Sequence, residues 1–395
     1  MTDAVTSARL ERAPIRALLV DPSLFTAPYD AALTQGLLAA GVQPMWATRP
    51  IRRGDDQEIP ARYTDPFFYR RVDDLPGLPR PLRALAKGAA HAVGLLRLLY
   101  RVWTGKPDVV HVQWVVLPPL DVAALWLIRM RTRYVLTVHD TVPFNGIRAS
   151  VLQNLGFDLP IRIADAVIVH TRAGKDRLIA RGIEADKIAV IPHGPLQMQA
   201  RPTRPRAGSD GRWTFVLFGE IKEYKGLDLI VEALGRLRGD IRDRCRVIVA
   251  GRPRMDVSDI QRRIDQLGLR ESIELRLHRH SMQEMADLFD AADTFVFPYR
   301  QVDASGVYFL VKGLGKWLIA SRVGVFAEDM RESLDGELIS PSNVEALAAA
   351  IERAARHRPQ GAGTRAADTW EAIGRSTRAL YVGNASSAGA AQAVA

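Results

Sequence analysis

One stretch late in the chain limits the choice of fold more than any other. An apolar run at residues 294–297 has the composition of a buried strand, and a polar loop at 300–305 follows it. Gly306 opens a second apolar segment that is long enough for a helix and ends before Gly315, and residues 317–320 form a third apolar run. Strand, loop, helix and strand in this order predict the parallel α/β unit, in which the loop after a strand faces the ligand crevice.

Ser305 and Gly306 lie at the start of the helix that is expected in this unit. Backbone N–H groups at a helix N-terminus favour an anion, so these two residues are candidates for close contact with a phosphate. Most loops of this kind in α/β proteins bind no phosphate. The unit alone therefore leaves both interpretations open.

The composition limits the class of protein. A chain of 395 residues predicts two or three domains, and 47% hydrophobic residues are enough for large cores. The net charge of +10 indicates an anionic partner, which can be a phosphate-bearing ligand, an acidic lipid or a nucleic acid. The single cysteine, Cys245, excludes an internal disulfide framework and a cysteine-based zinc site, which fits a reducing compartment.

Membrane spans and leader segments are not expected in this sequence. No apolar run reaches the ~18 residues that cross a bilayer. The N-terminal segment lacks the apolar core of a signal peptide before its first charges. We therefore expect a cytoplasmic protein without a transmembrane anchor.

The strand and helix pattern occurs twice along the chain. Strand segments alternate with helical segments from residue 15 onwards and again from residue 213 onwards. Between them, residues 198–212 are rich in Arg, Pro, Gly and Ser without an apolar period, which predicts an interdomain linker. The expected division is an N-terminal domain at 1–199, a linker at 200–211, a C-terminal domain at 212–368, a C-terminal helix at 369–384 that packs back towards the first domain, and a disordered tail at 385–395.

Residues 75–107 contain no Asp or Glu. Six basic residues lie among many apolar ones in this segment: Arg80, Arg83, Lys87, Arg97, Arg101 and Lys106. A basic amphipathic helix can lie in a membrane interface, with its apolar side chains buried and its cations on anionic headgroups. The alternative is a helix that packs on a sheet and has a solvated basic face. The length of the acid-free run favours the contact with an anionic membrane.

Several motifs resemble those of the GT-B glycosyltransferases, and of glycosyltransferase family four in particular. The sequence FVLFGEIKEYKG, which contains Gly219 and Lys225, is similar to the family's strand followed by G-R-x-x-x-x-K-G. DKIAVIPHGP resembles its strand before the linker, and DVVHVQW and YVLTVHDTVP resemble two strands that lead to a cleft histidine. FVFPYRQVDASGVYFLVKG resembles its donor-binding strand, loop and helix. The resemblance covers roughly residues 15–384 and implies a GT-B fold, with two Rossmann-like, doubly wound α/β domains that face a cleft.

Some positions depart from the family pattern. Glu220 stands where an arginine usually follows the first glycine, and Lys222 can supply the lost charge. The family's two glutamates would fall near Val302 and Leu310, which are not acidic, and the only acid of that loop is Asp303. These features are more similar to a divergent set that includes bacterial exopolysaccharide β-mannosyltransferases, whose reaction inverts the anomeric centre. The resemblance therefore favours inversion and leaves retention open.

The resemblance places the donor site in loops of the C-terminal half. Negative charge grows on the β-phosphate of a nucleotide sugar as the glycosidic bond breaks, so the site needs fixed cations and N–H donors. Loop lysines are often merely solvated, but the motif match favours this role for Lys222 and Lys225. The expected donor- and nucleotide-binding residues are Gly219, Lys222, Lys225, Gly251, Tyr299, Asp303, Ser305 and Gly306. No two aspartates are two positions apart, so we expect no metal ion and no cofactor besides the GDP- or UDP-linked sugar itself.

Three residues of the N-terminal half are expected near the reacting sugar. The resemblance assigns His139, at the end of a strand, to the donor sugar. A β-linkage also requires a general base for the acceptor hydroxyl, and Asp140 or Asp30 can serve from the same edge of the sheet. Either aspartate can instead cap the helix that follows it, so both interpretations stay open.

The sequence therefore predicts a metal-independent glycosyltransferase that builds an exopolysaccharide or another surface glycan. Its substrates would be a nucleotide sugar and a saccharide on a polyprenyl diphosphate, which it would reach from the inner face of the cell membrane. The alternatives are a retaining family-four enzyme with a soluble acceptor and, because both glutamates are missing, a non-catalytic scaffold that binds nucleotide sugars. A nucleic-acid-binding protein is not favoured, because the basic residues are spread along the chain without a recognisable recognition module.

Overall fold

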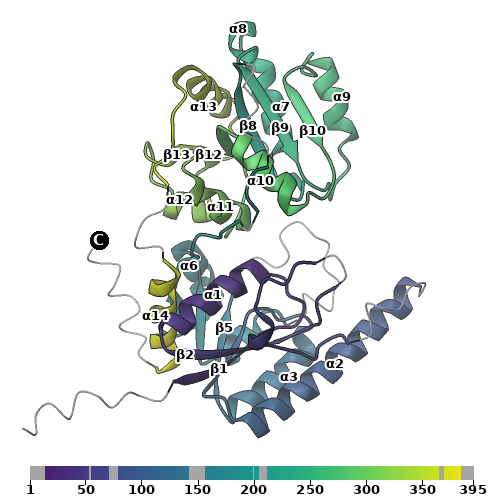
Figure 1. Cartoon of the computed structure of the whole chain (residues 1–395), viewed down its shortest axis with the longest axis vertical. Coiled ribbons are helices and arrows are strands. Elements are labelled where there is room, and N and C mark those ends of the chain that lie inside the picture. The colour runs from purple at the N-terminus through teal and green to yellow at the C-terminus, as the bar shows by residue number, and fades with distance from the viewer. Residues whose placement is uncertain are drawn as a thin grey trace, which may run out of the picture.

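In a computed structural model of the chain, two α/β units lie one above the other, each built on its own parallel sheet (Figure 1). The predicted fold class, two Rossmann-like doubly wound units, is confirmed. The structure describes residues 14–52, 55–70, 79–141, 156–198, 200–203, 211–363 and 369–383.

The N-terminal sheet has the strand order β3-β2-β1-β4-β5-β6-β7, and all neighbouring strands are parallel. The direction of winding reverses between β1 and β4, and such sheets bind ligands outside the carboxyl ends of the strands at this point. The strands are β1 (Ile15–Asp21), β2 (Val42–Thr48), β3 (Thr64–Pro66), β4 (Val109–Val112), β5 (Arg133–Thr137), β6 (Ala166–Val169) and β7 (Ile188–Val190). The helices are α1 (Ala27–Ala39), η2 (Ala61–Tyr63), α2 (Arg80–Gly105), α3 (Pro118–Arg129), α5 (Leu159–Ile163), α6 (Arg172–Ala180) and η3 (Ala185–Lys187).

The C-terminal sheet has the order β10-β9-β8-β11-β12-β13 and is also parallel throughout. Its reversal lies between β8 and β11, so the loops after these two strands flank the ligand crevice. The strands are β8 (Trp213–Phe218), β9 (Cys245–Ala250), β10 (Ile273–Arg276), β11 (Thr294–Phe297), β12 (Trp317–Ser321) and β13 (Gly336–Ile339). The helices are η4 (Glu223–Lys225), α7 (Leu227–Arg236), α8 (Gly239–Arg242), α9 (Ser258–Gln266), α10 (Met282–Ala291), α11 (Gly306–Val311), η5 (Lys312–Leu314), α12 (Gly324–Asp329) and α13 (Val344–His357).

The central strands are almost continuously apolar because helices cover both faces of each sheet. All four residues of β11, Thr-Phe-Val-Phe, are buried, and burial stabilises each phenylalanine by roughly 1.5–3 kcal/mol. Cys245 in β9 is buried as well, and this burial raises the pKa of its thiol to about 12. The reactive thiolate is therefore scarce at neutral pH.

The C-terminal helix α14 (Trp370–Tyr381) returns to the N-terminal unit and lies against α1 (Figure 1). A Cβ atom added at Gly374 would lie only 2.0 Å from the carbonyl oxygen of Gly36, so glycines allow the two backbones to touch. The hydroxyl of Tyr381 lies 2.7 Å from Nδ1 of His111 in β4. The last helix of the chain therefore completes the N-terminal unit.

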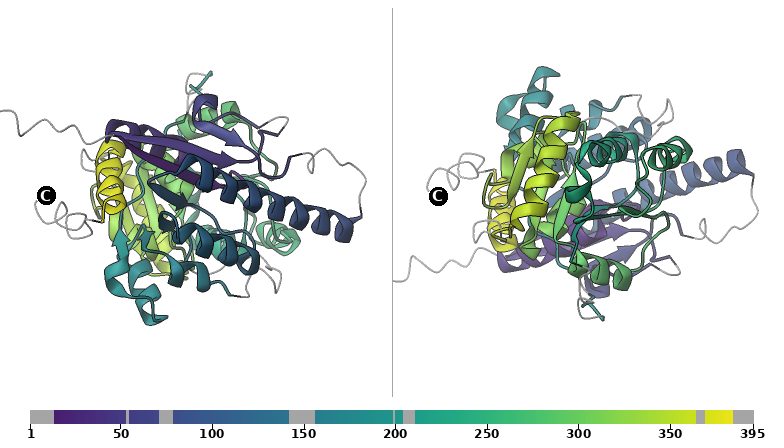
Figure 2. Two further views of the ribbon diagram at one scale, coloured as in Figure 1. Left: turned by 90° about the horizontal axis from the view of Figure 1, so that it is seen from below. Right: turned by 90° about the horizontal axis from the view of Figure 1, so that it is seen from above.

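The helix α2 is long and extends beyond the rest of the N-terminal unit at its first half (Figures 1 and 2). In the part of the chain that the structure describes, no helix is long and apolar enough to cross a membrane. Residues 75–78 of the expected basic segment, residues 204–210 of the expected linker and the expected tail at 385–395 lie outside the described residues.

Candidate active site

The loops after β8 and β9 meet at two glycines. Gly219 has a φ of +106° and Gly251 has a φ of +145°, a region that residues with a side chain rarely adopt. A Cβ atom added at Gly251 would lie 1.9 Å from the carbonyl oxygen of Gly219, so no larger residue fits there. This contact holds the two loops together at the carboxyl edge of the sheet, beside the reversal point of the strand order.

Lys225 lies beneath the Gly219 loop and is only 6% exposed. Its Nζ is 3.4 Å from the carbonyl oxygen of Phe218 and 5.4 Å from the ring centroid of Tyr299. Burial lowers the pKa of this amine to about 8. A carbonyl and an aromatic face compensate a buried ammonium poorly, so the position is prepared for an anionic ligand.

The helix α11 begins beside the same loop. A Cβ atom added at Gly219 would lie 2.7 Å from Nζ of Lys225 and 3.2 Å from Cγ2 of Val307, in the first turn of α11. The Ser305 hydroxyl caps this helix by accepting a hydrogen bond from the N–H of Tyr308 at 3.4 Å, and Gly306 is exposed. The structure therefore brings together five of the residues that the sequence assigned to the donor site, Gly219, Gly251, Lys225, Ser305 and Gly306.

The charge next to this loop is arranged differently from the sequence expectation. Lys222 does not point a free cation at the site, because its Nζ forms an ion pair with Glu220 at 3.3 Å. Arg254, which the sequence analysis missed, forms an ion pair with the same carboxylate at 2.5 Å. The sequence GRPR directly after β9 could have indicated Arg254, because a residue just after β9 lies at the same edge of the sheet as the loop after β8.

Two predicted donor residues lie behind the loop surface. Tyr299 is 1% exposed and packs under Lys225, so it shapes the position of the amine. Asp303 is 5% exposed, and its carboxylate accepts hydrogen bonds from Thr141 and Arg177 of the N-terminal unit. The structure thus gives Asp303 partners other than a nucleotide sugar.

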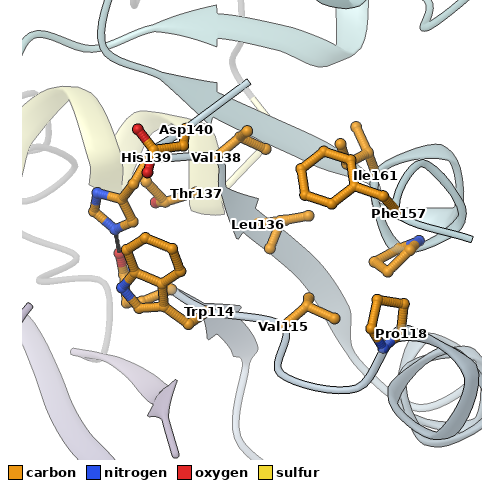
Figure 3. Close-up of a pocket in the computed structure, with 12 residues that line it drawn as sticks. Trp114, Val115, Pro118, Leu136, Thr137, Val138, His139, Asp140, Phe157 and Ile161 are labelled. Carbon is orange, nitrogen blue, oxygen red and sulfur yellow. Dashed lines mark hydrogen bonds between the residues drawn. The ribbon is translucent and has the colours of Figure 1, made fainter. Parts of the chain in front are cut away.

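His139 lies just after the end of β5, where it is half-buried and lines a pocket together with Trp114 (Figure 3). Its Nε2 is 3.1 Å from Oε1 of Gln113, and its Nδ1 is 3.2 Å from Nε2 of His170. Trp114 stacks on the ring with a centroid distance of 5.0 Å. Burial, and then the neighbouring His170, lower the pKa of His139 well below its ordinary value. The imidazole is therefore neutral at pH 7, and each of its ring nitrogens already has a hydrogen-bond partner.

The prediction that Asp30 can act as a general base is not supported by its position. Asp30 is fully buried in the first turn of α1. Burial, and then the nearby carboxylate of Asp21, raise its pKa well above the ordinary value. A fully buried carboxyl group is out of hydrogen-bond reach of an acceptor hydroxyl outside the core. The sequence placed Asp30 on the correct edge of the sheet but could not show that it points into the core.

Asp140 remains as the best-placed carboxylate. It is half-buried, lies three residues after the end of β5 and lines a pocket at the ends of β4 and β5 (Figure 3). Burial, and then Tyr299 and Asp140, raise the pKa of Tyr224 in the Lys225 loop. The carboxylate of Asp140 in the N-terminal unit therefore acts electrostatically on the Lys225 loop of the C-terminal unit.

The pocket beside Asp140 is lined mostly by apolar side chains and has an empty volume of about 630 Å³, including the part that is open to solvent. Trp114 and His139 form one side, and Pro118, Phe157 and Ile161 form the other (Figure 3). Aromatic and apolar walls with a few polar groups are typical of small-molecule sites. Among the described residues, no group of three or more His, Cys, Asp or Glu side chains is arranged to hold a metal ion.

Two family profiles match most of the chain. The profile described as Glycosyltransferase Family 4 matches residues 31–194, and the profile described as Glycosyl transferases group 1 matches residues 212–357. The first match lies in the N-terminal unit and the second in the C-terminal unit.

Curated relatives are distant. The D-inositol 3-phosphate glycosyltransferase of Mycobacterium ulcerans is 26% identical over 284 residues, which are 67% of this chain and 59% of the relative. The GDP-mannose-dependent alpha-(1-6)-phosphatidylinositol monomannoside mannosyltransferase of Mycolicibacterium smegmatis is 26% identical over 177 residues, which are 43% of this chain and 44% of the relative. The chain thus spans about half the length of these relatives.

Solved structures show the same fold. Anabaena HepE in complex with UDP and glucose has a TM-score of 0.63 at 16% identity, over 94% of this chain and 98% of that chain. The catalytic domain of starch synthase IV from Arabidopsis thaliana, bound to ADP and acarbose, has a TM-score of 0.64 at 12% identity, over 95% and 99% of the two chains.

Proposed function

The chain belongs to the GT-B glycosyltransferases of the family-four type, and we propose that it transfers a sugar from a nucleoside diphosphate sugar to an acceptor hydroxyl in the cleft between its two units. The observation that carries this proposal is the buried Lys225 between the Gly219 loop and the first turn of α11. A diphosphate in this position would be bound by the ammonium group of Lys225 and by the backbone N–H group of Gly306, whereas the N–H of Gly219 donates to the carbonyl oxygen of Ala250 at 3.0 Å. The ammonium group and the Gly306 N–H stabilise the charge that grows on the β-phosphate as the glycosidic bond breaks.

The reaction needs no metal ion in this proposal. Lys225 supplies the charge that a divalent cation would otherwise provide, and the N–H group of Gly306 at the start of α11 supplies a hydrogen bond. Asp140 takes the proton of the acceptor hydroxyl, which attacks the anomeric carbon from the face opposite to the leaving diphosphate, so the configuration inverts. His139, fixed by Gln113 and His170, lies beside Asp140 and shapes the position of the sugar.

The pocket beside Asp140 is the proposed acceptor site. When the hydroxyl group of an acceptor is within reach of Asp140, the rest of the acceptor would lie against Trp114 and Phe157. Sugars present apolar faces of C–H groups to aromatic rings, so a saccharide fits this wall. We place the saccharide on a lipid, as in the synthesis of an exopolysaccharide or another surface glycan.

The support for a lipid-linked acceptor comes from an apolar stripe on α2. Leu85, Leu96 and Tyr100 are 71%, 66% and 63% exposed, and they follow a helical spacing. The complete stripe of exposed apolar residues on this helix is Leu82, Leu85, Val93, Leu96, Tyr100 and Trp103. Exposed apolar stripes of this length on one helix mark interaction sites, and Arg83 and Lys87 lie exposed on the same helix. We propose that this stripe rests on the inner face of the cell membrane.

The basic residues contribute less to this contact than the sequence suggested. Nη1 of Arg97 donates to the carbonyl oxygen of Phe67 at 3.2 Å, and Nε of Arg101 donates to Asp65 at 2.7 Å. Both guanidinium groups are thus engaged by the segment around β3. The apolar stripe, rather than these two arginines, is the part of α2 to test.

A variant with Leu85→Glu and Leu96→Glu is expected to float with anionic vesicles at least ~10-fold less than the wild type, because two apolar contacts of roughly 1.5–3 kcal/mol each are lost. Flotation with phosphatidylglycerol vesicles measures this. Leu334→Glu is the matched control, because Leu334 is 55% exposed in the C-terminal unit. If the double variant floats like the control, α2 is not the membrane contact.

The proposed function is tested by binding and turnover in EDTA. We expect one nucleoside diphosphate from a panel of GDP, UDP and ADP to raise the unfolding temperature, because a ligand of the folded state stabilises it. The corresponding nucleotide sugar should then be consumed with a lipid-linked saccharide as acceptor. Binding without turnover on any lipid-linked or soluble acceptor would favour the scaffold, and no binding at all would contradict the proposal.

A further inference from the structure

One carboxylate of the C-terminal unit is buried against the N-terminal unit. Oδ2 of Asp303 accepts hydrogen bonds from the backbone N–H and the hydroxyl of Thr141, both at 2.5 Å. The guanidinium group of Arg177 in α6 forms an ion pair with the other oxygen and also donates to the Thr141 hydroxyl at 2.8 Å. Thr141 and Asp303 are 3% and 5% exposed. A buried carboxylate with this many donors fixes its partners precisely.

The two ends of this contact are next to the two halves of the candidate site. Thr141 directly follows Asp140, the proposed base. Asp303 precedes Ser305 and Gly306, at the start of α11, by two and three residues. The buried carboxylate of Asp303 therefore links the position of the proposed base in one unit to the position of the diphosphate site in the other.

The loop that carries Asp303 is itself held firmly. The carbonyl oxygen of Asp303 accepts a hydrogen bond from the N–H of Val325 at 3.0 Å. A Cβ atom added at Gly324 would lie 1.8 Å from the carbonyl oxygen of Val302, so the start of α12 lies directly on this loop. Movement of the carboxylate relative to α11 is therefore small, and the contact transmits the position of one unit to the other.

Two further contacts join the units on the same side of the cleft. The carboxylate of Glu328 accepts hydrogen bonds from the N–H groups of Arg172 and Ala173 at the start of α6, at 2.5 and 2.7 Å. His193 stacks on Phe309 of α11 with a centroid distance of 3.8 Å. These contacts keep the units joined when Asp303 is changed. A substitution of Asp303 should thus alter the geometry of the cleft without separating the units.

We propose that Asp303 is a positioning residue that sets the distance between Asp140 and the donor diphosphate, and that it does not bind the donor. This inference rests on the proposed function. A displacement of reacting groups by about 1 Å can lower a rate by about 10²-fold, so a small change of closure is enough to affect turnover.

The Asp303→Asn variant is expected to lower kcat for sugar transfer by about 10²-fold, because an amide cannot replace the ion pair with Arg177. The dissociation constant of the nucleoside diphosphate, measured by calorimetry, should change little. Asp335→Asn is the matched control, because Asp335 is also 5% exposed and pairs with Arg331 inside the C-terminal unit. This control should lose stability but keep the kcat of the wild type.

A second measurement reports the position of the units directly. Spin labels on Ala185→Cys and Gln261→Cys, exposed sites on different units, give an interunit distance by double electron–electron resonance, and the buried Cys245 stays unlabelled. The distance distribution should broaden with Asp303→Asn and stay narrow with Asp335→Asn. Thr141→Val, which removes one bond to the same carboxylate, should cause a smaller change in the same direction and serves if Asp303→Asn does not fold.

The outcomes separate this inference from the proposed function. If nucleotide affinity falls as much as kcat in Asp303→Asn, Asp303 is a donor contact and the inference is wrong. An unchanged kcat with an unchanged distance distribution would overturn it as well. Failure of the wild type to bind any nucleotide would instead contradict the proposed function, whereas the distance measurement would still report whether Asp303 fixes the two units.

Discussion

Replacement of Lys225 with methionine is expected to lower kcat/KM for sugar transfer by about 10²- to 10³-fold. This is the usual effect of removing one preorganised group that stabilises a developing anion. Methionine nearly fills the space of the lysine, so the variant removes the charge without leaving a cavity. The rate of nucleoside diphosphate release from the donor measures the effect. The shift of the unfolding temperature by the same nucleotide should disappear in parallel.

The same substitution separates a functional lysine from a structural one. Burial lowers the pKa of Lys225 to about 8. Below this pH the buried ammonium group therefore reduces the free energy of unfolding. Between pH 8 and the ordinary lysine pKa the unfolded state holds more protons, so this group makes stability rise with pH over that window. At pH 7 the Lys225→Met variant should therefore unfold at the same or a higher temperature than the wild type. A clearly lower temperature would mean that Lys225 supports the fold. Lys187→Met, at an ion pair with Glu184, is the control and should keep its activity.

The affinity for the nucleoside diphosphate is expected to fall above pH 8. A bound diphosphate stabilises the ammonium form of Lys225 and raises its pKa, so binding takes up a proton when the free amine is neutral. The dissociation constant should change little between pH 7 and 7.5, where the terminal phosphate is already mostly dianionic, and then rise up to about tenfold per pH unit. Calorimetry in buffers of different ionisation enthalpy detects the proton. If the dissociation constant is the same at pH 7 and 9.5, Lys225 does not hold the diphosphate.

The fold and the position of the loops that we propose as the donor site followed from the sequence because their signals are local. Each apolar strand and each glycine lies within a short segment, and the parallel order of the strands then places all loops on one edge. Gly219 and Lys225 are only six residues apart and belong to one loop. Their proximity to Ser305 followed from the position of both loops at the carboxyl edge of the same sheet.

The partners of the charged residues did not follow from the sequence, because they depend on contacts between distant segments. Asp303 and Thr141 are 162 residues apart and meet only when the two units are in contact. The pairing of Arg254 with Glu220, which also pairs with Lys222, depends on the ends of two neighbouring strands. The burial of Asp30 depends on the direction of one side chain at the first turn of α1. A sequence pattern gives the edge on which a residue lies, but the solvent exposure of its carboxylate requires the packed structure.

Replacement of Asp140 with asparagine is expected to lower kcat for sugar transfer by about 10²- to 10⁴-fold, the range for the loss of a general base. The nucleotide should bind as tightly as before, because Asp140 lies on the N-terminal side of the cleft and the diphosphate site lies on the other. Initial rates at saturating donor and acceptor, together with calorimetric binding of the nucleotide, measure both quantities. Asp186→Asn, at an exposed aspartate of the same unit, should behave like the wild type.

The stereochemistry of the product tests whether Asp140 acts as the general base. A base that deprotonates the acceptor hydroxyl is required when the hydroxyl attacks from the face opposite to the leaving diphosphate, so the anomeric configuration of the donor must invert. Proton NMR of the first product gives the configuration from the coupling constant of the anomeric proton. Retention of configuration would remove the need for Asp140 as a base, even if its replacement lowers the rate. Inversion together with an unchanged rate in the Asp140→Asn variant would instead exclude Asp140 as the base. Asp30 is buried and Asp303 is paired with Arg177. The base would then have to be a residue other than these three aspartates.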